Sequence, residues 1–344
     1  MNQEDSHDSI EPGQDVEIDC FRSEDAEGVA RLFRIVYGSG YPIQTFLEPE
    51  ILRRENAAGR TISTVARTPK GDIVGHNALY QSTPHPRTYE SGAGLVHPAY
   101  RGNKGMFTRL IAHGEETGCR EFGIEGIFGE AVCNHLLSQK AASRQGWITQ
   151  ALEVDLMPAS AYDKEKSATG RVSSLVDFKT LMPKPQRVCL PAVYEGAFRL
   201  LYGGLDDSRH MDFVENESLP DSATDIKTQF FAFAGVARIA VHAAGTEFAG
   251  SFDVQEQAVL KQGALVIQVW LPLAFPWISR LVGDLKERGY FLGGLLPRWF
   301  GGDGMLMQKI LQRPNWEGIQ LYSDRAGTIL ELVKADWART VNVS

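Results

Sequence analysis

The chain has 344 residues, of which 43% are hydrophobic and 23% charged, and its formal net charge is -8. This composition is typical of a globular protein that is long enough for two ordinary domains. The negative charge argues against nucleic acid as the main ligand, because binding to phosphates needs a basic surface. The longest apolar run, 264–279, contains two prolines and is shorter than the about 20 residues that span a bilayer, so no membrane segment is expected.

The cysteines and the N-terminus carry no metal-binding or targeting pattern. Cys20, Cys119, Cys133 and Cys189 form no C-x-x-C pair and have no histidine at zinc-finger spacing. We therefore expect reduced, mostly buried thiols in a cytoplasmic protein, and no metal site. Residues 1–15 are polar and acidic without an apolar core, which predicts a disordered N-terminus and no signal peptide.

Strands and helices alternate in the pattern of the first half of the chain. Ser23 is expected to cap a helix whose apolar residues recur at helical spacing, and Gly118 is expected to end another. In chain order, the expected elements are a strand at 16–22, helices at 23–37 and 48–56, strands at 61–67, 73–80 and 88–96, a helix at 104–117, a strand at 124–132, a helix at 134–145 and a strand at 147–157.

The second half begins with a strand at 172–181 and a proline-rich linker at 182–185. The segment 248–262 fits a strand, a turn or a short helix, and 305–311 fits a strand or a helix. The other expected elements are a helix after Pro191, an apolar run at 229–243 broken at Gly235, a strand at 264–271, a helix at 276–288, a strand at 289–296 and a closing helix at 324–340.

The segment 95–110 is the most informative part of the chain. An apolar strand runs into a turn containing Pro98, a basic and glycine-bearing loop follows, and a helix begins. This arrangement directs several backbone N–H groups to one point, with the helix dipole behind them, and therefore suits an oxyanion such as a pyrophosphate. The side chains there are neither nucleophiles nor metal ligands, so the loop is predicted to hold a cofactor.

This loop resembles the coenzyme-binding motif of the Gcn5-related N-acetyltransferase superfamily. The shared features are Val-x-Pro, Tyr-Arg-Gly, a basic residue and Gly within 96–105, followed by an amphipathic helix. The family core is Arg/Gln-x-x-Gly-x-Gly/Ala, whereas here three residues separate Arg101 from Gly105, and Phe107 replaces the small residue. The order of elements over 16–157 also resembles that of the family, as does Gly75 in its strand.

The resemblance implies an acyl-CoA-dependent N-acyltransferase in which an amine attacks the thioester directly. Acetyl-CoA is the expected co-substrate, another acyl-CoA is the alternative, and no metal is needed. The expected acceptor is a small-molecule amine. The residues implied to contact the cofactor are Leu95, Val96, Arg101, Gly102, Asn103, Lys104, Gly105, Met106, Phe107, Asn134 and Gln139.

Two residues are candidates for moving the acceptor's proton. Glu130 lies near the end of a mainly apolar strand, and His135 follows that strand. The alternatives are that Glu130 faces solvent or bonds a neighbouring strand, and that Asn134 only caps the next helix. Weaker candidates for contact with the acceptor are His97, Glu90 and Glu125. Arg298, in the Gly- and aromatic-rich segment 297–304, either binds a substrate carboxylate or anchors a tight connection.

The expected fold class is α/β (α+β), with tandem acetyltransferase-like domains that each have a mostly antiparallel mixed sheet flanked by helices. The block 264–311 repeats the second half of the family fold but has no loop like 101–107. The expected parts are a disordered 1–15, a coenzyme-binding domain at 16–182, a linker and helix at 183–205 and a degenerate domain at 206–344.

Two other functions stay open at this point. One is an inactive acyl-CoA-binding sensor or scaffold, and the other is an acyltransferase that uses a longer acyl-CoA or an acyl carrier protein. A homodimer is a possible assembly, whereas nucleic acid and membrane are not expected partners.

Overall fold

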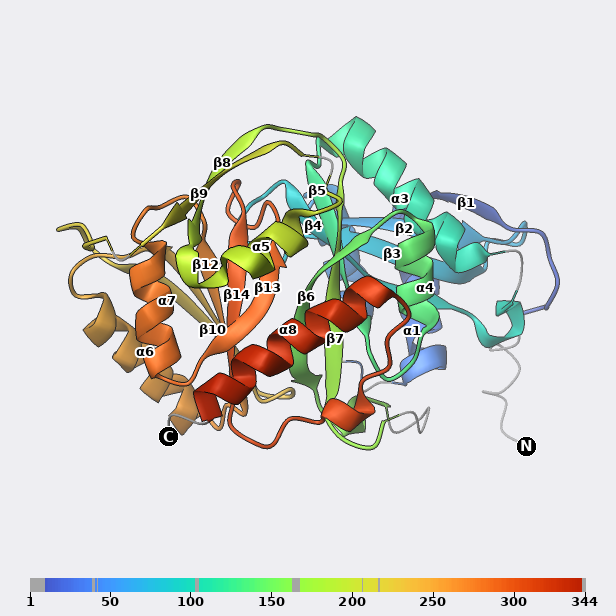
Figure 1. Cartoon of the computed structure of the whole chain (residues 1–344). Coiled ribbons are helices and arrows are strands. Elements are labelled where there is room, and N and C mark those ends of the chain that lie inside the picture. Colours follow the sequence, from blue (N-terminus) through green and yellow to red (C-terminus); the bar gives the residue numbers. More distant parts are fainter. Residues whose placement is uncertain are drawn as a thin grey trace. The chain divides into compact units, whose positions relative to one another are not determined.

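The structure, a computed structural model, describes residues 10–38, 41, 43–102, 105–162, 168–205, 207–215 and 217–341 (Figure 1). The chain divides into two compact units. Unit 1 comprises Met1–Ser82 and Tyr89–Ile124, and unit 2 comprises Thr83–Thr88 and Glu125–Ser344. The predicted boundary after residue 182 lies inside unit 2, and the predicted domains remain a prediction.

Unit 1 is an antiparallel sheet with helices packed on it. Its sheet order is β1-β2-β3-β4. Its elements are β1 (Glu17–Cys20), α1 (Ala26–Tyr37), α2 (Pro49–Ala57), β2 (Thr61–Arg67), β3 (Ile73–Tyr80), β4 (Thr88–Val96) and α3 (Met106–Phe122).

Two neighbouring residues of β3 show how the helices cover both faces of this sheet. Successive side chains of a strand point to opposite faces. A Cβ atom on Gly75 would lie 3.0 Å from Leu110 of α3, whereas the ring of His76 lies 5.4 Å from that of Phe33 of α1. Helices α1 and α3 therefore pack on opposite faces of β3, and the missing side chain at Gly75 lets α3 approach closely.

Unit 2 has a longer mixed sheet and a second, two-stranded sheet. The long sheet has the order β5-β7-β6-β13-β14-β12-β11-β10, and β8 pairs with β9 in the other. Neighbouring strands are antiparallel except β11–β12 and β8–β9. The elements are β5 (Gly126–Val132), α4 (Leu137–Arg144), β6 (Ile148–Met157), β7 (Val172–Thr180), β8 (Gln186–Pro191), α5 (Glu195–Tyr202), β9 (Arg209–Val214), β10 (Asp225–Phe231), β11 (Val236–Ala243), α6 (Phe248–Lys261), β12 (Val266–Pro272), α7 (Ile278–Glu287), β13 (Phe291–Leu296), β14 (Gly304–Ile310) and α8 (Asp324–Val341).

The same arrangement occurs twice within unit 2. The elements β5-α4-β6-β7 lie in the sheet order β5-β7-β6, and β12-α7-β13-β14 lie in the order β12-β14-β13. The two sets meet where β6 and β13 pair, with Ala151 opposite Gly294. The elements predicted for the block 264–311 are thus confirmed, with 305–311 as a strand. That this block belongs to a second acetyltransferase-like domain remains a prediction.

The expected fold class is confirmed at the level of mixed α/β units whose mostly antiparallel sheets are flanked by helices. Each unit has its own apolar core, and burial of such side chains is the main favourable term in folding. In unit 1 the core includes Val29, Leu32, Phe33, Leu52 and Val65. In unit 2 it includes Phe198, Phe248, Ile267, Leu281 and Phe291.

Gly118 does not end α3, contrary to the prediction. The helix continues to Phe122 and ends at Gly123, which has the left-handed φ of 61°. A Cβ atom on Gly118 would lie 2.8 Å from Ile124 and 2.9 Å from Leu79. The glycine at this position therefore allows close packing of the helix.

The chain is ordered earlier than predicted. The side chain of Ile10 is 7% exposed, and the Tyr100 hydroxyl donates a hydrogen bond to the Glu11 carbonyl at 2.6 Å. The prediction of disorder is therefore wrong for residues 10–15, because an apolar residue and a buried hydroxyl bind this segment to unit 1. Residues 1–9 lie outside the described part of the chain.

Two local predictions in the rest of the chain also need correction, and one of the alternatives left open for 248–262 is confirmed. Ser23 is not the cap of the first helix, since it begins a short 3-10 turn at Ser23–Asp25 and α1 follows with Asp25 at its N-cap position. The ambiguous segment 248–262 is α6. The helix expected after Pro191 is present as α5, but the strand β8, which Pro191 ends and which pairs with residues 209–214, was missed.

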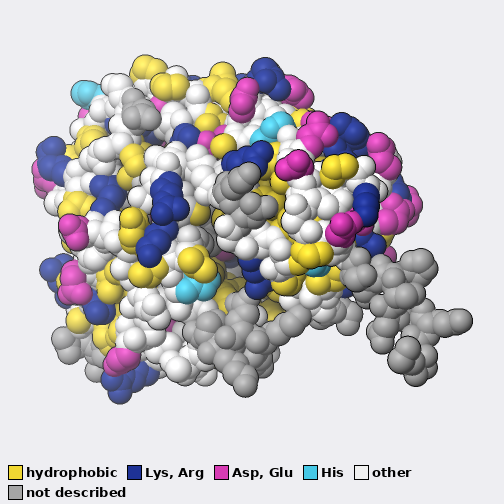
Figure 2. Space-filling model, turned by 90° about the vertical axis from the view of Figure 1, so that its right-hand side faces the viewer, with side chains coloured by type: hydrophobic (Ala, Val, Ile, Leu, Met, Phe, Trp, Pro, Cys, Tyr) yellow, Lys and Arg dark blue, Asp and Glu magenta, His cyan; other side chains and the backbone are white. Residues whose placement is uncertain are grey.

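Charged side chains on the surface of unit 1 pair locally. Arg53 bonds both Glu27 and Glu50, and Arg60 bonds Glu55. On the face that Figure 2 draws, acidic and basic side chains are interspersed. Exposed pairs of this kind contribute little to stability. Among the described residues, no helix is long and apolar enough to cross a membrane.

Candidate active site

A β-bulge lies near the end of β4, directly before the predicted cofactor loop. Ala93 and Gly94 together face the single residue Asn77 of β3. Ala93 has a φ of 49°, a conformation that residues other than glycine seldom adopt. Such a bulge interrupts the ladder and turns backbone groups away from the neighbouring strand. The sequence signal for it was the run Gly92–Gly94 inside a predicted strand.

A neutral histidine holds this bulge in place. The Nδ1 atom of His76 lies 2.9 Å from the Ala93 carbonyl oxygen, and its Nε2 atom lies 3.0 Å from the Ser63 hydroxyl. Burial lowers the pKa of His76 to about 4, although the hydrogen bond to Ala93 acts in the opposite direction. At neutral pH, Nδ1–H therefore donates to Ala93, and Nε2 accepts from Ser63.

His97 organises the turn that follows β4. Its backbone N–H donates to the Val74 carbonyl at 2.8 Å, and its Nδ1 atom accepts the N–H of Ala99 at 3.2 Å. Burial, followed by the nearby charges of Arg31 and Arg101, lowers the pKa of His97, so its ring can accept. These contacts give His97 a role in turn geometry.

The predicted cofactor contacts of the loop are described only in part, because Asn103 and Lys104 lie outside the described residues. Gly102 and Gly105 have left-handed φ values of 79° and 67°. The Arg101 side chain returns to the end of the strand, where its Nε atom lies 3.4 Å from the Val96 carbonyl. The glycines therefore shape the turn, whereas the Arg101 side chain points back to β4.

The side chains of the first two residues of α3 pack against the sheet of unit 1. Met106 is 3% exposed, and a Cβ atom on Gly75 would lie 3.1 Å from its sulfur. A Cβ atom on Gly94 would lie 2.5 Å from the Phe107 ring, so the ring occupies the space above the bulge. The first turn of α3 contains no acidic residue. Its backbone N–H groups and positive dipole end are therefore suited to an anion.

Glu130, the first candidate for the base, forms an ion pair within unit 2. Its carboxylate accepts a hydrogen bond from Arg238 of β11 at 2.6 Å, and its side chain is 20% exposed. Arg238 also donates to Gln268, which in turn donates to Glu153. Proton transfer to Glu130 would have to compete with this contact. The predicted role of Glu130 remains a prediction.

His135 contacts the backbone at the start of α4. Its Nδ1 atom accepts the N–H of Leu137 at 3.3 Å. Asn134 is 6% exposed, and its backbone carbonyl accepts a hydrogen bond from Gln320. The His135 ring thus satisfies a backbone N–H in the first turn of α4.

Gln139 binds a distant segment of unit 2. Its Nε2 atom lies within hydrogen-bond distance of the carbonyls of Val132, His135 and Gln320, and its Oε1 atom accepts the N–H of Tyr322. The amide thus holds the segment before α8 against α4. A contact of Gln139 or Asn134 with a cofactor remains a prediction.

Arg298 is fully buried and paired. It donates to Asp207 at 2.6 Å and to Glu125 at 3.2 Å, and its φ is 60°. Asp303 pairs in the same cluster with Arg209 at 2.8 Å. These contacts favour the alternative in which Arg298 anchors a tight connection over the one in which it binds a substrate carboxylate. Glu125, a weaker candidate for contact with the acceptor, is paired with Arg298 in the same cluster.

The predicted site residues fall into two groups, one in each unit. Unit 1 contains Leu95, Val96 and the described part of 101–107, which are contiguous around the end of β4. Unit 2 contains Glu130, Asn134, His135 and Gln139, which lie on β5, α4 and the segment between them.

One cluster was missed by the sequence analysis, which predicted no metal site. Asp19, Cys20 and His113 each offer one ligand atom, and these atoms all lie within 4.8 Å of one another. Cys20 and His113 are 93 residues apart in the chain. The pairing of β1 and the packing of α3 bring them together, and no local spacing rule could reveal this.

The comparisons with known proteins point to acetyltransferases of known structure. No protein-family model matches, and no curated protein matches. A putative acetyltransferase from Salmonella typhimurium, solved with its cofactor acetyl-CoA, is 13% identical, with a TM-score of 0.40, over 50% of this chain and 96% of its own. An N-acetyltransferase from Staphylococcus aureus Mu50 is 12% identical, with a TM-score of 0.40, over 49% of this chain and 99% of its own.

A putative acetyltransferase of the GNAT family from Desulfovibrio desulfuricans is 15% identical, with a TM-score of 0.38, over 48% of this chain and 99% of its own. Each of these structures leaves about half of the present chain unmatched. All three are described as acetyltransferases, and the one from Desulfovibrio desulfuricans is described as a member of the GNAT family.

Proposed function

We propose that the chain is an acyl-CoA-dependent N-acyltransferase, with acetyl-CoA as the default donor and a small-molecule amine as the acceptor. The observation that carries this proposal is the bulge, turn and helix start in unit 1. Ala93 and Gly94 interrupt β4, glycines with left-handed φ shape the turn, and α3 begins without an acidic residue. Such a helix start favours a pyrophosphate.

The proposed reaction is direct acyl transfer. The amine nitrogen attacks the thioester carbonyl carbon, the C–S bond breaks, and the CoA thiolate takes up a proton. The amine must lose a proton during this attack, which is the task proposed for Glu130 or His135. Glu130 is the first choice because it is a partly exposed carboxylate at 20% side-chain exposure.

The rival proposal, a sensor or scaffold that binds acyl-CoA without turnover, rests on one contact. Arg238 holds the Glu130 carboxylate at 2.6 Å. If this ion pair persists when acyl-CoA is bound, Glu130 does not serve as a base.

A pair of measurements tests both proposals. Thermal unfolding is followed with acetyl-CoA and with acetylpantetheine, which has the thioester but no pyrophosphate. We expect acetyl-CoA to raise the unfolding temperature and acetylpantetheine to have little effect. Release of the CoA thiol is then followed with a panel of amines, on the intact chain and on Glu130→Gln.

The outcomes separate the two functions. Thiol release that depends on an amine supports the acyltransferase, and its loss in Glu130→Gln supports the role of this carboxylate. Stabilisation without release for any amine supports the sensor. If acetyl-CoA does not stabilise the protein, both proposals are wrong.

A further inference from the structure

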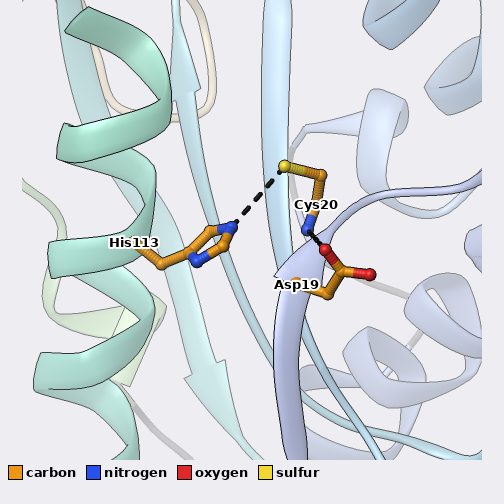
Figure 3. A group of neighbouring side chains, drawn as sticks. All are labelled: Asp19, Cys20 and His113. Carbon is orange, nitrogen blue, oxygen red and sulfur yellow. Dashed lines mark hydrogen bonds between the residues drawn. The ribbon is translucent and has the colours of Figure 1, made fainter. Parts of the chain in front are cut away.

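Asp19, Cys20 and His113 form a small cluster on unit 1, at the end of β1 and beside α3 (Figure 3). The Cys20 sulfur lies 3.5 Å from Nε2 of His113. All three side chains are partly exposed, so an ion from solvent can reach them. A thiolate, an imidazole and a carboxylate are the three ligand types that Zn²⁺ takes from proteins.

The spacing of the sulfur and the nitrogen fits one shared ion. With a Zn–S distance of about 2.3 Å, a Zn–N distance of about 2.0–2.1 Å and a tetrahedral angle, the two ligand atoms should lie about 3.6 Å apart. The distance in the structure is 3.5 Å. A carboxylate oxygen of Asp19 lies within 4.8 Å of both atoms, so a small movement of that side chain would complete three ligands.

The Asp19 carboxylate is held by donors that orient it. The backbone N–H of Cys20 donates to its Oδ1 atom at 2.8 Å, and Arg22 donates to its Oδ2 atom. Burial raises the pKa of Asp19. The hydrogen bonds from Cys20 and Arg22 and the charges of Arg22 and Arg67 together outweigh this effect, so the pKa lies below its usual value. Hydrogen-bonded carboxylates are common as metal ligands, because the outer contacts fix the ligand's direction.

A cavity adjoins the cluster. It has a volume of about 650 Å³ and lies entirely on unit 1. Cys20 and Thr117 form part of its wall, together with residues of α2 and β2 such as Arg53 and Ile62. Of the three residues only Cys20 lines the cavity, so a further ligand such as water would reach the ion from the side of the thiol. Three protein ligands and one open position are the pattern of an accessible zinc site.

We propose that Asp19, Cys20 and His113 bind one Zn²⁺ ion, with the fourth coordination position facing the cavity between β1, α2, β2 and α3. This site is separate from the proposed acyl transfer, which needs no metal. The thiolate neutralises one charge of the ion, and the carboxylate of Asp19 is shared between the ion and Arg22.

Binding of Zn²⁺ and Co²⁺ to the chelator-treated full chain tests this site. We expect one zinc ion per chain by competition with a zinc indicator, and a thiolate-to-metal charge-transfer band with Co²⁺. Cys20→Ser and His113→Gln should each weaken zinc binding at least tenfold, and Cys20→Ser should abolish the band. Cys119→Ser is the matched control, because Cys119 is a partly exposed thiol on α3, the helix that carries His113. This variant should bind zinc like the unaltered protein.

Unfolding in the presence of a chelator checks that each variant is folded. If Cys20→Ser does not fold, His113→Gln still tests the site. Zinc binding that Cys20→Ser and His113→Gln leave unchanged would overturn the proposal. So would the absence of a Co²⁺ thiolate band in the unaltered protein. Since acetyl-CoA binding is measured separately, the site can fail without the acyltransferase failing.

Discussion

The starts of α3 and α6 each follow a strand, yet their N-cap residues differ in charge, Gly105 before α3 and Glu247 before α6. Helix α3 follows β4, and α6 follows β11. Both strands bulge near their ends. In β4 Ala93 and Gly94 face one residue, and in β11 His242 is the extra residue between Val241 and Ala243.

The connections after the two bulges differ. The one before α3 spans 97–105 and ends at Gly105, the N-cap residue of the helix. The one before α6 spans only 244–247, and the carboxylate of Glu247 lies there and accepts the N–H of Thr224 at 2.8 Å. The backbone N–H groups of Thr224 and Glu247 hold the pKa of that carboxyl below its usual range.

The chain also covers the start of α6. A Cβ atom on Gly245 would lie 1.6 Å from the Ser222 carbonyl oxygen, so the segment before β10 crosses directly over the connection. At α6 the chain crosses the connection at Gly245, and Glu247 stands at the N-cap position, where its side chain bonds Thr224 and makes no hydrogen bond to the helix start as the structure describes it. The two segments thus share the order of strand and helix and differ in the connection, since a glycine precedes α3 and a glutamate precedes α6.

The largest expected effect concerns the histidine that fixes the bulge of β4. An unfolded histidine binds a proton near pH 6.5, whereas folded His76 does so only at about 4. The unfolded state therefore binds more protons in this window, so stability falls as the pH falls from about 6.5 to about 4. The titration of His76 should lower the free energy of unfolding by about 3 kcal/mol over this pH range.

Urea unfolding between pH 7 and pH 4 measures this dependence. The variant His76→Gln removes the titrating ring and should flatten the curve over this window. Equal slopes for the variant and the unaltered protein would show that His76 is not the group responsible.

The next effect concerns the contact between the bulge and α3. Gly94→Ala places a methyl group 2.5 Å from the Phe107 ring and should lower the free energy of unfolding by about 1–3 kcal/mol. A double-mutant cycle with Phe107→Ala measures the coupling, because removing the ring should relieve the clash. Additive effects of the two substitutions would mean that the ring and the bulge are not in contact.

A charge placed at the start of α3 should make it resemble α6. Nothing lies within 4 Å of a Cβ atom on Gly105, and Asn and Asp both tolerate its left-handed φ of 67°. We expect Gly105→Asp to weaken acetyl-CoA binding about tenfold relative to Gly105→Asn, because only the former adds a negative charge beside the phosphates. Calorimetric titration of the two variants gives the comparison, and equal affinities would place the phosphates elsewhere.

The smallest effect is expected at α6. Glu247→Gln removes the carboxylate charge but leaves the segment over Gly245 in place. We expect the unfolding temperature to fall by about 1–2 °C, with no second acetyl-CoA site in titration. A second binding event in this variant would mean that the carboxylate alone closes the start of α6.

Local patterns were sufficient for most elements and insufficient for most contacts of the site. The alternation of β2 and β3 and the stripe of α1 are visible in the sequence, because each depends on residues close in the chain. The pair of Glu130 with Arg238 joins residues 108 positions apart. Such a contact depends on how the sheet of unit 2 is ordered, which no local spacing encodes.

The glycines also show that local roles could be predicted and contacts with distant residues could not. Gly118 looks like a helix end, but its role depends on Leu79 and Ile124 packed against it. Gly102 was predicted correctly as part of the loop, because its left-handed φ of 79° is a local property. The prediction failed where a glycine serves a distant neighbour.

The short segment Thr83–Thr88 has a consequence for how this protein can be divided or recombined. It connects β3 and β4 of unit 1 but belongs to unit 2, where the His85 N–H donates to the Trp299 carbonyl and the Thr88 hydroxyl donates to that of Arg298. A gene fragment that stops at Ile124 would encode this segment without its acceptors. Unit 1 therefore cannot be inherited or exchanged as a single uninterrupted stretch of sequence without redesign of that connection.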